Sequence, residues 1–295
     1  MLKPIVVGVD GSRESTAAAH WAAAEALRRA APLRLVHAWE GQPQADVTLP
    51  ELRAPQYWAR RALRSVSDQL LQKHPKVYLS TEQVRTAPVP ALVAESASAE
   101  LLVLGSQGLG SVSGVLAGSV ALAVASRAVC PVVLVRATYT RDSERLPCGD
   151  RSEGPGAPRD VALAIDLRGT SDTVTEFAFR AAESRGAPLR VVHTWHVPVR
   201  RGLVGPGERA TFREHAEAEL ALAMKPWREK FPSVPVREVV AEGWPTHHVA
   251  RAAAGAGLLV VGRRARSAAL GPRTGAVTHA VIHHVGCPVA VVPHG

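Results

Sequence analysis

The sequence predicts an α/β protein made of two tandem, doubly wound domains, each built on a parallel sheet. Three observations support this prediction: segments that occur twice, strands that alternate with helices, and a turn-rich stretch between the two copies. With 295 residues, the chain is long enough for two domains of ordinary size, each with a buried core.

The repeat is defined by four landmark segments that occur twice in the same order. The two copies of each landmark lie 156 or 157 residues apart, so the offset is constant within one residue. One order and one offset for all four landmarks indicate a tandem duplication. The paired segments are 5–10 with 161–166, 33–39 with 189–195, 101–105 with 258–262, and 130–135 with 287–292.

Strand and helix patterns alternate along the first copy. Unbroken apolar runs are typical of parallel strands buried on both faces, and segments rich in Ala, Leu, Glu and Arg are typical of helices. Such alternation predicts a doubly wound sheet that binds ligands at the carboxyl ends of its strands. The predicted strands are 5–10, 33–39, 77–84, 101–104 and 132–135, and the predicted helices are 15–31, 55–73, 90–99 and 119–128.

The stretch 138–159 separates the copies. It holds three prolines and three glycines among charged residues and has no apolar period, which predicts a flexible surface linker. The N-terminal domain is therefore expected at 1–137 and the C-terminal domain at 160–295.

Charge and composition argue against several classes of partner. The net charge of +9 is spread along the chain, and aromatic residues make up only 4%, so we expect neither a basic stripe nor a stacking platform for nucleic acid. No apolar stretch reaches the roughly 18 residues of a membrane span. The first ten residues read as a strand rather than a leader peptide, so we expect a cytoplasmic protein.

The three cysteines have neither a metal-ligand spacing nor the even count of a disulfide framework. His37 and His193, at equivalent strand ends, have no second ligand spaced with them and are interpreted as packed core histidines. We therefore expect no metal site.

Two segments at predicted strand ends have an unusual composition. Asp10, Gly11 and Ser12 directly follow the first strand, and the segment 105–119 holds five glycines and four serines before a helix. A strand-to-helix turn normally needs about two to six residues, so the length of the second segment favours a function over an ordinary flexible turn. Its glycines can bring backbone N–H groups close to an anion, and the helix start at Ser119 adds more, which predicts a phosphate site.

Two common phosphate motifs do not match this loop. Ser111 follows Gly110 where G-x-x-x-x-G-K-[ST] requires Lys, and no G-x-G-x-x-G follows the first strand. What remains is the pattern Gly105-x2-Gly108-x9-Gly118-Ser119. This pattern resembles the ATP-binding signature of the universal stress protein family, G-x2-G-x9-G-[ST], with its spacing intact.

The resemblance extends to segments 7–12, 36–38 and 130–133, and it covers almost the whole chain. It implies a five-stranded sheet of order 3-2-1-4-5 in each domain and ATP, alone or with Mg²⁺, as the ligand. The implied contacts are Gly8, Val9 and Asp10 beside the adenine with Gly11 in the same turn, the Ala38 backbone at the adenine edge, Gly105, Ser106, Gln107 and Gly108 along the ribose and phosphates, and Gly118, Ser119 and Val120 on the phosphates.

Two interpretations of the role of Asp10 are open. A carboxylate can accept hydrogen bonds from adenine N6 or a ribose hydroxyl, as the resemblance implies. An aspartate before a glycine can equally be a turn-forming residue.

The second copy keeps the frame of this site but changes its chemistry. Leu167 and Arg168 stand where the first copy has Gly11 and Ser12, and Ala276 stands where it has Ser119. Lost glycines obstruct close approach to phosphate, whereas the added arginines can bind it. Both a weakened site and an altered, charge-based site stay open, and we expect the weakened one. The residues of this second site are Asp166, Thr194, Gly262, Arg263, Arg264, Gly275, Ala276 and Val277.

The loop also bears on catalysis. No Lys, Arg, His, Asp or Glu occurs within 105–126, although phosphoryl transfer needs charge stabilisation and a positioned nucleophile. We therefore expect no catalytic residue and a regulatory ATP-binding stress protein whose nucleotide state alters partner interaction or assembly. A slow ATP hydrolase of the same fold and a structural interaction protein with vestigial sites are the alternatives.

The last strands, 132–135 and 289–292, bear on assembly. In the implied order each lies at a sheet edge, and exposed apolar edges invite pairing. The resemblance suggests that they pair antiparallel between the domains, so we expect the two halves of one chain to pair through these strands. A homodimer and an unidentified protein partner are compatible with the sequence.

Overall fold

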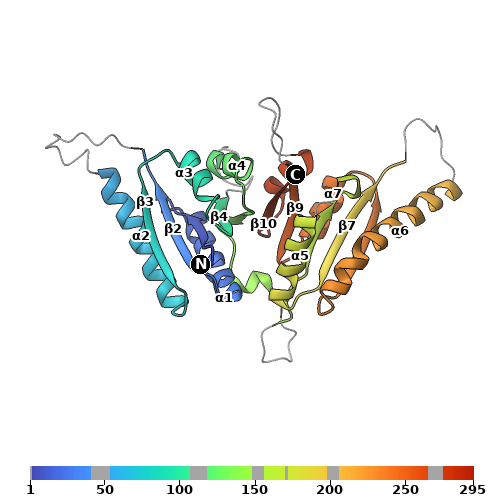
Figure 1. Ribbon diagram of the computed structural model, residues 1–295, viewed down its shortest axis with the longest axis horizontal. Helices are drawn as coiled ribbons and strands as arrows, with labels where there is room; N and C mark the ends of the chain where they lie inside the picture. Colours follow the sequence, from blue (N-terminus) through green and yellow to red (C-terminus); the bar gives the residue numbers. More distant parts are fainter. Residues whose placement is uncertain are drawn as a thin grey trace. The chain divides into compact units, whose positions relative to one another are not determined.

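The chain forms two compact units, Met1–Thr140 and Arg141–Gly295, in a computed structural model of the protein (Figure 1). The structure describes residues 2–40, 54–106, 118–147, 156–169, 172–197, 206–264 and 275–295.

The first domain alternates strands and helices, as the sequence predicts. Its five strands are all parallel and run in the order β3-β2-β1-β4-β5, as the family resemblance implies. The elements are β1 (Ile5–Gly8), α1 (Arg13–Arg29), β2 (Leu33–Ala38), α2 (Ala54–Lys73), β3 (Leu79–Val84), α3 (Pro88–Glu95), β4 (Leu101–Ser106), α4 (Ser119–Ala125) and β5 (Val132–Arg136).

Helices in this domain form pairs on the sheet. Helix α1 contacts α2 and lies on β1 and β4, whereas α3 contacts α4 (Figure 1). The buried alanines of α1 let the helix approach the sheet closely, and Trp21 fills the core beside them. The central strands β1 and β4 are buried along most of their length because helices cover the sheet.

The second domain repeats this topology with the strand order β8-β7-β6-β9-β10, again all parallel. A short 3-10 helix, η3, occupies the position of the Asp10 turn of the first domain. The elements are β6 (Val161–Ile165), η3 (Leu167–Gly169), α5 (Asp172–Arg185), β7 (Leu189–Trp195), α6 (Pro206–Lys230), β8 (Val236–Glu242), α7 (Pro245–Ala253), β9 (Leu258–Arg264), α8 (Ala276–His284) and β10 (Val289–His294).

The observed ends differ from the predicted ends by a few residues. Helix α1 begins at Arg13 rather than residue 15, because the hydroxyl of Ser12 caps it by accepting from the Ser15 N–H at 3.1 Å. Helix α3 begins at Pro88, which suits the first turn because a proline there loses no helical hydrogen bond.

Part of the predicted linker has regular structure. A 3-10 helix, η2 (Arg141–Glu144), opens the second unit, and Arg145 forms an antiparallel bridge with Pro158. Glu144 is buried there, so the described part of 138–159 is folded against its domain. This differs from the flexible linker that the sequence predicts.

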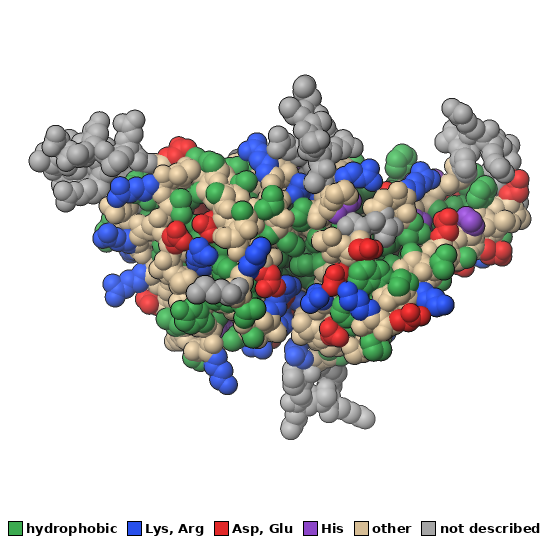
Figure 2. All heavy atoms as spheres, viewed as in Figure 1, with side chains coloured by type: hydrophobic (Ala, Val, Ile, Leu, Met, Phe, Trp, Pro, Cys, Tyr) green, Lys and Arg blue, Asp and Glu red, His purple; other side chains and the backbone are tan. Residues whose placement is uncertain are grey.

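Charged side chains are mixed on the molecular surface. On the face of each domain seen in Figure 2, Lys and Arg lie among Asp and Glu. Of the helices within the described ranges, none is long and apolar enough to cross a membrane.

Candidate functional site

The Asp10 turn lies at the carboxyl end of β1, in the middle of the first sheet. The carboxylate Oδ1 of Asp10 accepts from the backbone N–H of Ser12 at 2.9 Å and from its hydroxyl at 2.6 Å. This is the aspartate-centred turn that formed the alternative reading of the residue. One oxygen of Asp10 therefore has a structural role, and Oδ2 accepts no hydrogen bond from the residues that the structure describes.

Opposing effects set the pKa of Asp10. Partial burial raises it, but the hydrogen bonds from Ser12, with a smaller contribution from Ser15, outweigh burial and hold the pKa below its ordinary value. The carboxylate is thus ionised at neutral pH and is an acceptor.

At two positions near this turn, backbone conformation or packing explains why the residue is glycine. Gly11 has φ +87°, a left-handed conformation that disfavours other residues. A Cβ on Gly8 would lie 2.7 Å from the Leu104 side chain and 3.2 Å from that of Leu92, so this glycine is explained by core packing. Val9 is buried, and its N–H donates to the carbonyl of Val36 at 2.9 Å.

The start of the glycine-serine loop lies against the Asp10 turn. Strand β4 is hydrogen-bonded to β1, and a Cβ on Gly105 would lie 2.6 Å from both the Glu14 carbonyl carbon and the Ser15 nitrogen. The start of the second predicted segment therefore lies against the first turn of α1, which directly follows the first segment. Because the strand order reverses between β1 and β4, this is the topological switch point where open α/β sheets bind ligands.

Ser106 and Gly118 flank the loop. The Ser106 side chain is buried, and its hydroxyl has no hydrogen-bond partner within the described part of the chain. Gly118 precedes α4 without a side-chain cap, and a Cβ there would meet no atom of a described residue within 4 Å. Ser119 and Val120 form the first turn of α4, whereas Gln107 and Gly108 lie outside the described residues.

The predicted adenine edge lies one strand away. Ala38 is the last residue of β2, next to Trp39, whose N–H donates to Val84 at 3.0 Å. The half-buried His37 belongs to β2, and its Nδ1 has no hydrogen-bond partner among the described residues.

In the second domain, the corresponding strand ends surround a cavity of about 860 Å³, which is the size of a small-molecule site. The cavity lies at the carboxyl ends of β6, β7 and β9 and at the start of α8, between α6 and α7. Of the second-site residues predicted from the sequence, those that line it are Asp166, Thr194, Gly262, Arg264, Gly275, Ala276 and Val277.

Arg263 does not line this cavity, although the sequence placed it in the second site. Its side chain is buried, with 6% exposed, between Gly262 and Arg264, which both line the cavity. Alternate residues of a strand point to opposite faces, so the register that brings Arg264 to the cavity turns Arg263 away.

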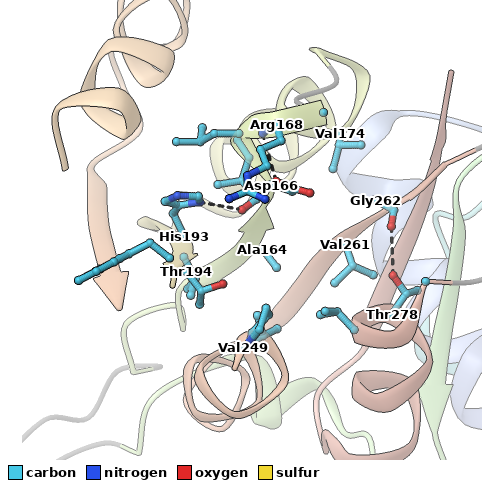
Figure 3. A pocket seen from close by; sticks show the side chains of 18 of the residues that line it. Ala164, Asp166, Arg168, Val174, His193, Thr194, Val249, Val261, Gly262 and Thr278 are labelled. Carbon is cyan, nitrogen blue, oxygen red and sulfur yellow. Dashed lines mark hydrogen bonds between the residues drawn. The ribbon is translucent and has the colours of Figure 1, made fainter. Parts of the chain in front are cut away.

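Several hydrogen bonds fix the cavity wall (Figure 3). The Thr278 hydroxyl donates to the Gly262 carbonyl at 3.1 Å and ties α8 to β9. The Arg168 N–H donates to Asp166 Oδ1 at 3.1 Å, which repeats the turn seen at Asp10. His193 Nδ1 lies 3.3 Å from the Ile165 carbonyl oxygen.

The sequence reading missed part of this wall. His193 is buried as predicted for a core histidine, yet it also lines the cavity. Trp195 and Phe212 stack with their ring centroids 6.2 Å apart and form an aromatic side. A signal for His193 and Trp195 was present in the sequence, because a histidine stands two residues before a tryptophan at the end of the second strand of each domain. Phe212 lies on a long helix, where no motif indicates it.

The fold defines a class, the doubly wound α/β domains, and the chain has two of them. Open sheets of this class bind ligands at the switch point. The profile of the Universal stress protein family matches residues 1–136 and again residues 158–293. The chain belongs to the universal stress protein family and carries its domain in tandem.

Known proteins resemble the chain over nearly its full length. A universal stress protein of Mycobacterium tuberculosis is 35% identical over 97% of this chain and 96% of its own length. A crystal structure of a universal stress protein from Archaeoglobus fulgidus matches 99% of this chain and 98% of its own with a TM-score of 0.69 and 16% identity, a likeness of fold. A universal stress protein solved in complex with cAMP is 29% identical over 46% of this chain and 98% of its own, with a TM-score of 0.38.

Proposed function

We propose that the chain is an ATP-binding regulatory stress protein whose first domain holds the nucleotide at the carboxyl ends of β1 and β4. The observation that carries the proposal is the intact spacing Gly105-x2-Gly108-x9-Gly118-Ser119. This motif begins on β4, which is hydrogen-bonded to β1, the strand that leads into the Asp10 turn. Membership of the universal stress protein family supports the proposal, because this spacing resembles the ATP-binding signature of that family.

Each part of the proposed site has suitable chemistry. Oδ2 of Asp10 can accept from adenine N6 or a ribose hydroxyl while Oδ1 maintains the turn. The buried Ser106 hydroxyl offers a further polar contact. The first N–H groups of α4, after the uncapped Gly118, can donate to a phosphate oxygen.

The proposed role is regulation rather than catalysis. The segment 105–126 contains no acidic, basic or histidine side chain that would act as a general base or stabilise a transferred phosphoryl group. Nucleotide occupancy would instead change which partner the protein meets or how whole chains assemble, in a cytoplasmic setting. Mg²⁺, where it accompanies ATP, would neutralise phosphate charge.

The test compares equivalent glycines in the two domains. Gly118→Val introduces a branched side chain at the predicted phosphate position, and we expect ATP affinity to fall about tenfold or more, roughly 1.4 kcal/mol. The matched variant Gly275→Val, before α8, should change ATP affinity little, so wild-type protein should show one dominant ATP site. At both positions a Cβ would meet no atom of a described residue within 4 Å, so we expect both variants to fold.

Isothermal titration of the full chain, with and without Mg²⁺, measures this, and circular dichroism verifies folding. cAMP, the ligand of the solved relative, serves as a second probe. Unchanged ATP affinity in folded Gly118→Val, or two equally tight ATP sites in wild-type protein, would overturn the assignment. Steady-state phosphate release would favour the hydrolase alternative, and failure to bind any nucleotide would favour the structural alternative.

A further inference from the structure

The long helices α2 and α6 occupy equivalent places in the two domains but carry opposite charge. Each joins the second strand of its sheet to the strand at the sheet edge, β3 or β8, and packs on both of these strands (Figure 1). Residues 57–72 of α2 hold three arginines and one aspartate, whereas residues 208–222 of α6 hold four glutamates and two arginines. The duplication has therefore left one chain with two long helices of complementary charge.

The exposed face of α2 combines aromatic and arginine side chains. Tyr57 and Trp58 are 61% and 58% exposed, and their ring centroids lie 5.7 Å apart. The guanidinium of Arg61 lies 5.4 Å from the ring centroid of Trp58. Arg60, Arg61 and Arg64 are exposed, and none of them forms an ion pair within the described ranges. Trp, Tyr and Arg are the residues that most often dominate the binding energy of protein interfaces, so this face has the composition of an interface.

The second domain has an apolar groove of about 420 Å³ between α6 and β8. Its apolar wall is made of small and branched side chains, and Leu222, which is 73% exposed, adds to the apolar surface of α6. Among the described strands, β8 is hydrogen-bonded to β7 alone, so the groove lies at the edge of the sheet. The groove is lined by Glu217, Ala218, Ala221, Glu238 and Val240.

Carboxylates on α6 near this groove are weakly engaged. Glu214 is exposed and forms no ion pair with a described residue. Glu217 lies 3.7 Å from Arg213, one turn away on the same helix. Glu219 lies 3.1 Å from His215 in the same way. Exposed pairs of this kind contribute little to stability, so these carboxylates can accept charge-assisted hydrogen bonds from the arginines of a partner.

We propose that a second copy of this chain docks here, with the aromatic and arginine face of α2 in one copy against the groove between α6 and β8 in the other. Trp58 enters the apolar groove, and the arginines that follow it on α2 contact Glu214 and Glu217. The contact does not depend on nucleotide binding in the first domain.

Two features favour a second copy over other partners. A helix that lies on a membrane needs a free apolar face, whereas the apolar face of α2 is buried in its own domain. The buried residues of that face are Ala59, Leu63, Val66 and Leu70. The chain itself carries the acidic groove that matches α2, and like charges oppose a contact of α2 with α2 or of α6 with α6.

Sedimentation of the full chain without nucleotide, over a range of protein concentrations, measures the contact. At about 0.15 M salt, screening over about 8 Å weakens the repulsion that the net charge of +9 causes, while charges in contact still attract. We expect wild-type protein to self-associate as its concentration rises. The reversals Arg61→Glu/Arg64→Glu and Glu214→Arg/Glu217→Arg should each weaken association about tenfold or more.

A mixture of these two reversed variants is the sharper test. In the mixture, each reversed face meets a face of opposite charge, and the unreversed faces also match. The mean net charge of the mixture equals that of wild-type protein. Association should therefore return to about the wild-type level, although each variant alone has lost it.

Matched controls separate the contact from general effects of charge and hydrophobicity. Arg127→Glu/Arg251→Glu changes the net charge as much as the reversal on α2, at exposed positions outside both helices, and should leave association within about twofold. Trp58→Ala should weaken association about tenfold or more, whereas Trp244→Ala, which removes a tryptophan that is 79% exposed, should not. All these side chains are exposed, so the variants should fold, and circular dichroism verifies this.

Three results would overturn the proposed contact. The first is wild-type protein that stays monomeric, which would leave the α2 face to an acidic surface of a different protein. The second is association that either charge reversal leaves unchanged, or that the control pair weakens equally. The third is a mixture of the two reversed variants that does not associate.

Discussion

At the scale of single residues, Asp10 shows how one side chain can serve both readings that the sequence left open. Its Oδ1 organises the turn with Ser12, and the residue stays exposed at the carboxyl end of β1. Ser12 in turn caps α1 through Ser15. The Asp10–Ser12 pair therefore links turn geometry, helix capping and the ionisation of the proposed nucleotide contact.

Replacing Ser12 by Ala should raise the pKa of Asp10 toward its ordinary value, because the variant loses the strongest of the hydrogen bonds that together outweigh partial burial. Loss of the helix cap should cost about 0.5–2 kcal/mol of unfolding free energy. A carboxyl-detected NMR titration of Asp10 and chemical denaturation measure the two effects.

The sign of the pH dependence follows from the lowered pKa. Ionised Asp10 stabilises the native state above its unfolded pKa, and this contribution is lost as pH falls through the folded value. The stability difference between wild type and Ser12→Ala should therefore shrink below the ordinary aspartate pKa. Ser98→Ala, which removes a hydroxyl on the surface after α3, is the control, and a pKa for Asp10 unchanged by Ser12→Ala would contradict the assigned cause.

At the scale of elements, the motif glycines separate into two kinds. Gly105 lets the first turn of α1 approach β4, since a Cβ would stand 2.6 Å from backbone atoms of Glu14 and Ser15. At Gly118, at the start of α4, a Cβ would meet no atom within 4 Å among the residues that the structure describes. One sequence motif therefore combines a packing requirement with the proposed binding requirement.

Gly105→Ala should destabilise the first domain by about 1–3 kcal/mol, because the clash is with backbone that cannot move without shifting α1. Gly118→Ala should leave the unfolding free energy nearly unchanged and weaken ATP binding. Thermal and denaturant unfolding of both variants, with ATP titration of the folded protein, test the distinction. Equal destabilisation by the two substitutions would show that the glycines share one role.

At the scale of the whole molecule, the duplication keeps one fold and gives its two domains different strand-end chemistry. The first domain retains the glycine-serine motif, and the second surrounds a cavity with arginine, histidine and aromatic side chains. Pairing of the domains through β5 and β10 stays a prediction from the sequence and the family resemblance.

Hydrogen exchange in the full chain tests this pairing. At a free sheet edge only alternate N–H groups donate to the neighbouring strand, whereas a strand paired on both sides has all of them protected. We expect slow exchange at consecutive amides of Val132–Arg136 and of Val289–Val292. Fast exchange at every second amide of both strands would show that these edges are unpaired.

Much of the fold could be predicted from the sequence, because its signals are local or repeated. Buried parallel strands require continuous apolar runs, and duplication marks equivalent elements, so the strands and the number of domains followed from patterns such as 5–10 and 161–166. The strand order followed from the family resemblance. The strand-end loops were located for the same reason. Helix ends were less predictable, because caps such as Ser12 depend on individual hydrogen bonds.

Only the tertiary structure decided how the site residues are arranged. Spacing alone could not show that Gly8 and Gly105 are explained by packing, that the strand register turns Arg263 away from the cavity, or that Gly169 makes room for Arg264. Each of these facts depends on contacts between residues far apart in the chain. The sequence by itself determined the duplicated fold and the positions of its loops, and the three-dimensional packing decided which side chains line the cavity of the second domain.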